Sequence, residues 1–241
     1  MFIGSDGETG GFRPENSSLL TAYFAVLDKD GELIDELDLS TKPDDGEYKY
    51  TQEALDVNGI DLKEHDKIAI TYTEASKLLI DFLEKHTESG KNKLTLLGQN
   101  VGFDRNFFIY HLLMDNESLW QKYFTDYIED TLLIAGRLKN AKVLQTKGGK
   151  LKLESLCEVF SIPLDAHKAK DDTLATIEVW KRLKLMIKEE RFLLKKELKE
   201  KKGIEEVDSY FDKLVKEKSG PEYMQTYIDQ EINFTVKKEL T

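Results

Sequence analysis

The hydrophobic and polar positions of this chain follow two periods, one typical of β-strands and the other of α-helices. An apolar run at the amino terminus predicts a first strand, and the runs 19–28 and 32–39 predict a hairpin around the turn at 29–31. Two short strands are expected at 94–98 and near 127–128. Apolar residues at helical spacing predict helices at 51–57, 73–86, 103–114 and 153–160, one that begins at 131, and one that runs for roughly thirty residues from 171.

The order of these elements predicts the fold class. Three strands followed by alternating strands and helices are typical of an α/β fold with a mixed sheet and a hairpin at one side. Because ligands bind at the ends of central strands in such sheets, functional residues are expected where strands end and helices begin. Beyond residue 190 the pattern predicts helices at 207–215 and 222–229 and a strand at 232–236, with breaks at 203 and 219–221.

Composition narrows the class of protein. With 241 residues, of which 40% are apolar, the chain can bury one substantial core and form a smaller appendage. The single cysteine, Cys157, cannot form an internal disulfide and falls on an apolar helical face. No apolar stretch reaches membrane-spanning length and no basic region precedes an apolar one at the amino terminus, so we expect a cytoplasmic protein in a reducing compartment, with no membrane partner. The net charge of −11 argues against a surface that coats nucleic acid throughout.

The first strand ends in two carboxylates, Asp6 and Glu8, separated by one residue. Side chains alternate along a strand, so both point to the same side of the sheet, where two anions repel each other unless a cation lies between them. Thr9 and the glycines that follow allow a tight turn close to a ligand. On its own, this pattern more often marks a plain acidic strand end.

Two further segments carry acids at helix starts. Asp104 follows the strand at 94–98 and lies in the first turn of the next helix, where an acid also interacts well with the helix dipole. His167 precedes Asp172 by five residues, in a loop that enters the long helix. The ordinary interpretation of that loop is a surface histidine followed by acids at a helix start.

Three other histidines complete the set. His65 and His86 are expected at the surface, and His111 is expected to pack on the helix that follows Asp104. None of them adds to the candidate chemistry.

Together, the three acidic segments resemble the DnaQ-like (DEDDh) 3′–5′ exonuclease family. The resemblance rests on Asp-x-Glu-Thr at 6–9, Asn-x-x-Phe-Asp at 100–104 and His-x-Ala-x-x-Asp at 167–172, and it covers about residues 1–187. Two positions depart from the family pattern, since many members have threonine where this chain has Gly10 and histidine where it has Gln99.

The resemblance implies a ribonuclease H-like mixed five-stranded sheet flanked by helices. Residues 1–187 would form the exonuclease domain, and 188–241 a mainly helical extension of unknown role. That extension is expected to wrap the catalytic domain, to dock a polymerase or another protein, or to pair two chains.

The same resemblance implies the catalytic groups. Asp6, Glu8, Asp104 and Asp172 match the four family carboxylates, which hold two divalent cations, Mg²⁺ or Mn²⁺, the hard ions that oxygen ligands suit. His167 matches the family's general base, and the five-residue spacing selects Asp172 rather than Asp171. The activity implied is metal-dependent hydrolysis of phosphodiester bonds at 3′ ends, which releases nucleoside 5′-monophosphates.

A single-stranded 3′ end is the expected partner of these groups. Phe12 is expected either to stack on a terminal base or to join the core. The segment 137–152 has six basic and no acidic residues, which favours contact with a nucleic-acid backbone. The segment 181–202, with ten basic and four acidic residues, fits a solvated helix face equally well. The full set of expected substrate contacts is Thr9, Gly10, Phe12, Asn100, Phe103, Lys142 and Lys147.

Three classes of function remain open from the sequence. The first is a DNA exonuclease that prefers single strands, for proofreading, repair or degradation. The second is the same chemistry on RNA ends, and the third is a non-catalytic scaffold on the same fold. The presence of all five catalytic-type residues disfavours the scaffold.

Overall fold

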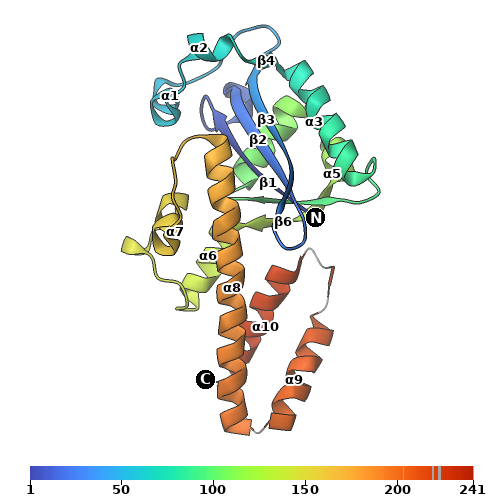
Figure 1. The fold of residues 1–241 in the computed structure, drawn as a ribbon, viewed down its shortest axis with the longest axis vertical. Helices are drawn as coiled ribbons and strands as arrows, with labels where there is room; N and C mark the ends of the chain where they lie inside the picture. Colours follow the sequence, from blue (N-terminus) through green and yellow to red (C-terminus); the bar gives the residue numbers. More distant parts are fainter. Residues whose placement is uncertain (203, 219, 222–223, 241) are drawn as a thin grey trace.

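A six-stranded mixed sheet forms the centre of the protein. The computed structural model describes residues 1–202, 204–218, 220–221 and 224–240 (Figure 1). Its strands are β1 (Phe2–Thr9), β2 (Leu19–Leu27), β3 (Leu33–Lys42), β4 (Ile70–Thr71), β5 (Leu94–Gly98) and β6 (Phe124–Asp130). They lie in the order β4-β3-β2-β1-β5-β6. β2 pairs antiparallel with β1 and β3, and the other three pairs are parallel.

The predicted mixed sheet with a hairpin at one side is confirmed, and it has one strand more than the five expected. The added strand, β4, has two residues and pairs in parallel with the end of β3. Two residues are too few to show a period of two, so no alternation marks this strand in the sequence.

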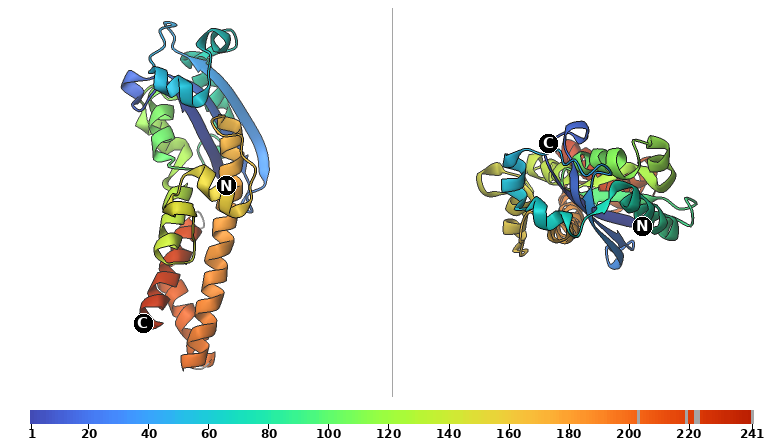
Figure 2. Two further views of the ribbon diagram at one scale, coloured as in Figure 1. Left: turned by 90° about the vertical axis from the view of Figure 1, so that its left-hand side faces the viewer. Right: turned by 90° about the horizontal axis from the view of Figure 1, so that it is seen from above.

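Helices cover both faces of the sheet (Figure 2). They are α1 (Gln52–Asn58), α2 (Leu62–Asp66), α3 (Tyr72–Thr87), α4 (Gly102–Phe107), the π-helical turn η2 (Phe108–Leu112), α5 (Glu117–Tyr123), α6 (Thr131–Asn140), α7 (Leu153–Phe160), α8 (Ala169–Lys202), α9 (Ile204–Glu217) and α10 (Gln225–Leu240), with 3₁₀ turns η1 (Pro14–Asn16) and η3 (Lys147–Gly149). One face packs on α3, α4, η2 and α5, in a core that includes Phe24 and Phe108. The other packs on α6, α7 and α8, in a core that includes Tyr23 and Trp180. Because β2 sends Tyr23 and Phe24 to opposite faces, the strand is buried on both sides.

Gly4 allows α8 to approach the central strand β1 closely. A Cβ atom added to Gly4 would lie 2.9 Å from Ile177 Cδ1 and 3.2 Å from Thr173 Cγ2. The first turns of α8 therefore lie directly over β1, which brings the amino-terminal end of this helix beside the carboxyl-terminal end of the strand.

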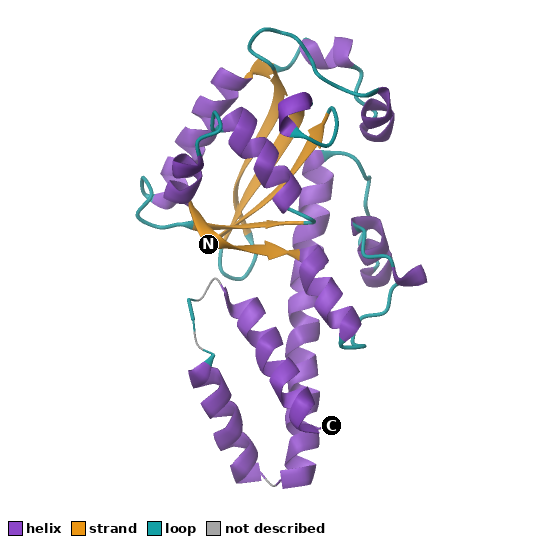
Figure 3. Cartoon of the chain, turned by 180° about the vertical axis from the view of Figure 1, so that it is seen from behind, coloured by secondary structure: helices purple, strands orange, loops and turns teal. Residues whose placement is uncertain are grey.

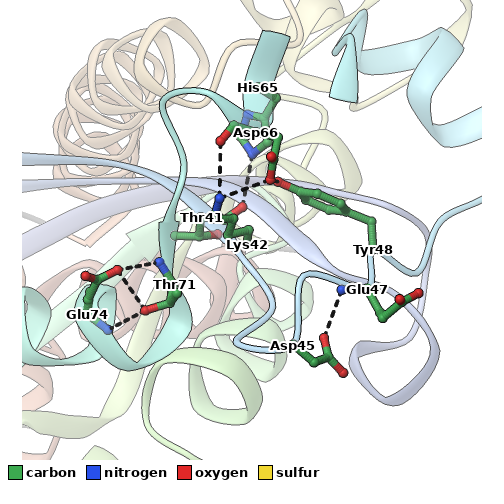
Figure 4. Close-up of polar contacts among 9 residues, drawn as sticks. All are labelled: Thr41, Lys42, Asp45, Glu47, Tyr48, His65, Asp66, Thr71 and Glu74. Atoms are coloured by element: carbon green, nitrogen blue, oxygen red, sulfur yellow. Dashed lines mark hydrogen bonds and ion pairs between the residues drawn. The ribbon is translucent and has the colours of Figure 1, made fainter. Parts of the chain in front are cut away.

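The segment between β3 and β4 is fastened to the sheet through α2. His65 Nε2 lies 3.0 Å from Thr41 O, and Asp66 Oδ1 accepts from Lys42 Nζ at 3.1 Å and from the Tyr48 hydroxyl at 3.2 Å (Figure 4). The surface position expected for His65 is therefore wrong. The residues around it are mostly polar, so no apolar period indicates that the ring is buried.

Two other histidines also contact the framework of the fold. His111 lies in η2, after Asp104 as expected, and its Nε2 is 2.9 Å from Ser17 O. The surface position expected for His86 is wrong, because its side chain is 9% exposed and its Nε2 lies 2.8 Å from Asp35 Oδ2.

A long helix joins the sheet to a helical extension (Figures 1 and 3). α8 runs without a break for 34 residues, and its lower half packs with α9 and α10 around a third core. The strand predicted at 232–236 is wrong, because Ile232 and Val236 are one helical turn apart on α10 and both face this core. The helix predicted at 222–229 is confirmed from Gln225 onward, whereas residues 203, 219 and 222–223 lie outside the described residues.

Two expectations from composition can be compared with the structure. Cys157 is buried in the core beneath α7, as its apolar helical face predicts. In the part of the chain that the structure describes, no helix is both long and apolar enough to cross a membrane.

Candidate functional site

Three carboxylates from two elements meet at the end of the central strand. Asp6 and Glu8 project from β1, and Asp172 projects from the first turn of α8. One oxygen of each lies within 4.8 Å of the others. The alternation along β1 and the close approach of α8 at Gly4 together produce this arrangement.

Asp104 completes the acid cluster, a name used below for Asp6, Glu8, Asp104 and Asp172. It lies in the first turn of α4 and is only 5% exposed. Its carboxylate accepts hydrogen bonds from the backbone N–H groups of Gly7 and of Asp104 itself, which places it against β1. The four acids span 166 positions of the sequence, from Asp6 to Asp172, and they are neighbours in the folded protein.

The pKa values of all four acids in the cluster are raised. Burial raises the pKa of Asp6 well above its ordinary value, and the charges of Asp104, Glu8 and Asp172 raise it further. Burial, followed by the charge of Asp172, raises the pKa of Glu8 to about 7. Burial is also the main cause of the raised pKa values of Asp104 and Asp172. Among the described residues, no Lys, Arg or His side chain forms an ion pair with any of the four.

The carboxylate of Asp172 is only half satisfied by hydrogen bonds among the described residues. Its Oδ2 accepts a hydrogen bond from the backbone N–H of His167 at 3.0 Å, but its Oδ1 is buried without a hydrogen-bond partner. A buried carboxylate oxygen without a donor is unfavourable, and a divalent cation satisfies such an oxygen. The donor set, all hard carboxylate oxygens, suits Mg²⁺ or Mn²⁺.

His167 lies at the rim of the acid cluster. It is exposed, and its backbone is in the left-handed region at φ 69°, a conformation held by the hydrogen bond from its N–H to Asp172. Asp171 takes no part in the three-carboxylate group and lines a separate surface hollow beside Pro163. The structure thus brings together the pair that the five-residue spacing selects.

The turn after β1 is shaped by Thr9 and Gly10. The Thr9 hydroxyl donates to Gly11 O at 2.7 Å, and the Gly10 N–H donates to Ser18 O at 2.8 Å. A Cβ atom on Gly10 would lie 2.3 Å from Lys49 O, so this position has no room for the threonine found in many proteins with the same motif. Phe12 follows this turn with 88% of its surface exposed, which excludes the alternative that it joins the core.

The loop between β5 and α4 carries the next candidates. Asn100 is exposed with φ 56°, and its N–H donates to Asp130 Oδ1 at 3.0 Å. Phe103 is half-buried, with its ring centroid 5.0 Å from that of Phe107. Both residues stand within one helical turn of Asp104 along the chain, so they are close to the acid cluster.

Sequence reasoning did not find the contacts that hold these loops together. Gln99 donates to Leu151 O at 2.8 Å and accepts from the Thr131 hydroxyl, so one side chain links the ends of β5, α6 and α7. Asp130 caps α6 by accepting from Leu132 N at 2.9 Å while it also holds Asn100. No local pattern in the sequence indicates these contacts.

The two predicted basic contacts lie in the segment between α6 and α7. Lys142 lines a groove between α6 and α10 together with Glu190 and Phe234. Lys147 lies on η3, with its Nζ 3.7 Å from Glu158 Oε1 and 85% of its side chain exposed. Substrate contact by these two lysines stays a prediction.

Solved structures of exonuclease I have the same fold as this chain. Escherichia coli exonuclease I in complex with a dT13 oligonucleotide superposes with a TM-score of 0.65 at 22% identity, over 80% of this chain and 43% of that one. The zinc-bound form of the E. coli exonuclease I complex with single-stranded DNA gives 0.63 at 23% identity, over 76% and 40%. Exonuclease I of Methylocaldum szegediense gives 0.60 at 20% identity, over 78% and 40%.

These likenesses establish the fold class. The ribonuclease H-like mixed sheet flanked by helices, with a helical part at the carboxyl terminus, is confirmed. The chain spans about two fifths of the length of these exonucleases. No protein-family model and no curated protein sequence matches the chain.

Proposed function

We propose that this protein is a metal-dependent 3′–5′ exonuclease that hydrolyses phosphodiester bonds at the 3′ ends of single-stranded DNA and releases nucleoside 5′-monophosphates. The observation that carries the proposal is the acid cluster, in which carboxylates from β1, α4 and α8 converge and raise one another's pKa values. The fold likeness to exonuclease I, whose complexes contain single-stranded oligonucleotides, supports the substrate class. Such an enzyme would act in proofreading, repair or degradation of DNA inside the cell.

The four carboxylates would hold two divalent cations, Mg²⁺ or Mn²⁺. Bound there, the cations would offset the negative charge of the phosphodiester and lower the pKa of a water molecule. The raised pKa of Glu8, about 7, means that the site releases protons when it takes up cations near neutral pH. Asp6 lies on β1 and Asp104 on α4, so these two elements fix both carboxylates before substrate arrives.

His167 would accept the proton from the attacking water. Its imidazole is exposed at the cluster rim. The hydrogen bond from the His167 backbone N–H to the Asp172 carboxylate holds the residue beside that carboxylate. An imidazole is suited to this task because its ordinary pKa is about 6.5.

The substrate strand would enter beside the turn after β1. The exposed ring of Phe12 would stack on a base near the 3′ end, and Thr9, Gly10, Asn100 and Phe103 would surround the terminal nucleotide. Base stacking of this kind tolerates any sequence, as a trimming enzyme requires.

Residues 1–187 would be the catalytic domain and 188–241 the extension. The third core, formed by α8, α9 and α10, gives the extension its own packed interior. We propose that it provides a surface for a protein partner, such as a polymerase.

A matched pair of substitutions tests the function. End-labelled single-stranded DNA and RNA of the same sequence are incubated with the full chain and Mg²⁺ or Mn²⁺. We expect Asp172→Asn to lose at least about 10³-fold in rate, and Asp171→Asn, one residue away but outside the three-carboxylate group, to retain wild-type rate. Equal rates for the two variants, or activity in excess chelator, would exclude the proposed site. Faster cleavage of RNA than of DNA would keep the chemistry and change the substrate.

A further inference from the structure

A cavity lies at the opposite end of β1 from the acid cluster. We call it the junction cavity; its volume is ≈ 290 Å³, and its walls include Phe2, Lys93, Glu129, Lys184, Lys188 and Thr226. It lies where the amino-terminal end of β1 and the start of α10 approach each other (Figures 1 and 3). Phe2 and Asp6 are four positions apart on β1, which corresponds to roughly 13 Å along the strand.

The volume of the junction cavity, ≈ 290 Å³, limits the size of its ligand. Small-molecule sites have volumes from about 300 Å³ upward, so the junction cavity has room for one compact ligand and not for a strand of nucleic acid.

Glu129 gives the junction cavity an unsatisfied acceptor. This residue of β6 is 1% exposed, and its Oε2 accepts from Trp180 Nε1 at 3.2 Å. Its Oε1 is buried and has no hydrogen-bond partner. Burial raises the pKa of Glu129 to about 7. Because an unpaired buried acceptor is unfavourable, a ligand that brings an N–H donor to Oε1 gains affinity.

Lysines supply positive charge around the same cavity. Lys93 precedes β5, and Lys184 and Lys188 lie one turn apart on α8. None of the three forms an ion pair with a residue that the structure describes, whereas Asp229, the other acid of the cavity wall, is paired with Arg191 at 2.8 Å. The cavity therefore attracts an anion at its lysines and an N–H donor at its buried acceptor.

We propose that the junction cavity binds a nucleoside monophosphate. Its phosphate would lie against Lys93 and Lys188, and an N–H group of its base would donate to Glu129 Oε1. Phe2 and Ile187 add apolar atoms to the cavity wall. The proposal concerns a second site and does not depend on whether the acid cluster hydrolyses nucleic acid.

Binding is tested on the full chain in excess chelator, which keeps the acid cluster free of cations and therefore repulsive to phosphate. Adenosine 5′-monophosphate, inorganic phosphate and adenosine are titrated separately by calorimetry. We expect the nucleotide to bind at least about tenfold more tightly than either fragment, because only the nucleotide uses both the lysines and Glu129. Equal affinity for inorganic phosphate, or no binding of the nucleotide at about 1 mM, overturns the proposal.

Two double variants locate the site. Lys93→Ala with Lys188→Ala should weaken nucleotide binding by about tenfold or more. Lys91→Ala with Lys196→Ala removes two exposed lysines outside the cavity and should leave binding unchanged. Equal effects of the two pairs overturn the proposal.

Two single variants separate this cavity from the acid cluster. Glu129→Gln turns one acceptor oxygen into a donor and should remove the preference for the nucleotide over phosphate, with the fold checked by circular dichroism. Asp6→Asn should bind the nucleotide as the wild type does. Loss of binding in Asp6→Asn would move the ligand to the acid cluster and overturn the proposal.

Discussion

Replacing Glu8 by glutamine should stabilise the cation-free protein at neutral and alkaline pH while it abolishes hydrolysis. The carboxylate of Glu8 lies near Asp6 and Asp172 with no cationic partner among the described side chains. Glutamine has nearly the same shape and carries no charge. The substitution therefore removes the repulsion and keeps the packing.

The magnitude follows from the pKa of Glu8. Burial, and then the charge of Asp172, raises it from 4.5 to about 7. The folded state thus holds this proton more tightly than the unfolded state, so the stability it contributes is present below pH 4.5 and is lost as the pH rises through about 7. At 1.36 kcal/mol per unit, the loss is about 3 kcal/mol. The raised pKa values of Asp6 and Asp104 act in the same direction.

Urea unfolding in excess chelator, followed by the fluorescence of Trp120 and Trp180, measures this effect. We expect the free energy of unfolding of the wild type to fall between about pH 5 and about pH 8, and that of Glu8→Gln to fall by about 3 kcal/mol less. Glu189→Gln, an exposed substitution on α8, should follow the wild type. A wild-type free energy of unfolding that does not fall over this range would refute the reasoning.

Other substitutions test single roles. His167→Asn keeps a residue that tolerates φ 69° and should lower kcat by about 10²–10⁴-fold, with partial recovery at higher pH; an unchanged kcat would assign proton transfer to another group. Phe12→Ala should leave the melting temperature unchanged, because the ring is 88% exposed, but should raise KM for single strands; an unchanged KM would exclude stacking. Replacing Lys142, Lys147 and Lys150 by glutamine should raise KM alike for different sequences. It should also reduce the slope of log affinity against log salt by about 0.7 for each lost contact. An unchanged slope would mean that the three side chains are solvated and do not contact the substrate.

Elements with a complete apolar period were predictable from the sequence. The strand at 94–98 and the helix at 153–160 have the predicted bounds, since each combines an uninterrupted apolar pattern with a clear stop. α2 and α5 were not predicted, because each is short and mostly polar. Segment 232–236 shows the opposite error, since two β-branched residues four positions apart fit a helix as well as a strand.

The candidate site was predictable in part because a strand fixes side-chain direction. The alternation along β1 placed Asp6 and Glu8 on one side, and spacing from His167 selected Asp172, which the structure brings to them. Contacts between distant segments had no such signal. The bond from Gln99 to Leu151 joins residues 52 positions apart, and no local pattern indicates it.

Because α8 has no break, the number of its residues fixes how the extension is oriented relative to the sheet. Deleting one residue from its middle would turn everything beyond by about 100° and shift it by about 1.5 Å. That rotation would remove Gln230 Nε2 from Ile134 O, now 3.3 Å away, and Lys237 Nζ from Ala141 O, now 2.9 Å away. A change of about seven or about eleven residues, two or three full turns, would restore the facing sides but would shift the extension by about 10–16 Å. Proteins that share this extension should therefore vary in loop length and conserve the length of this helix.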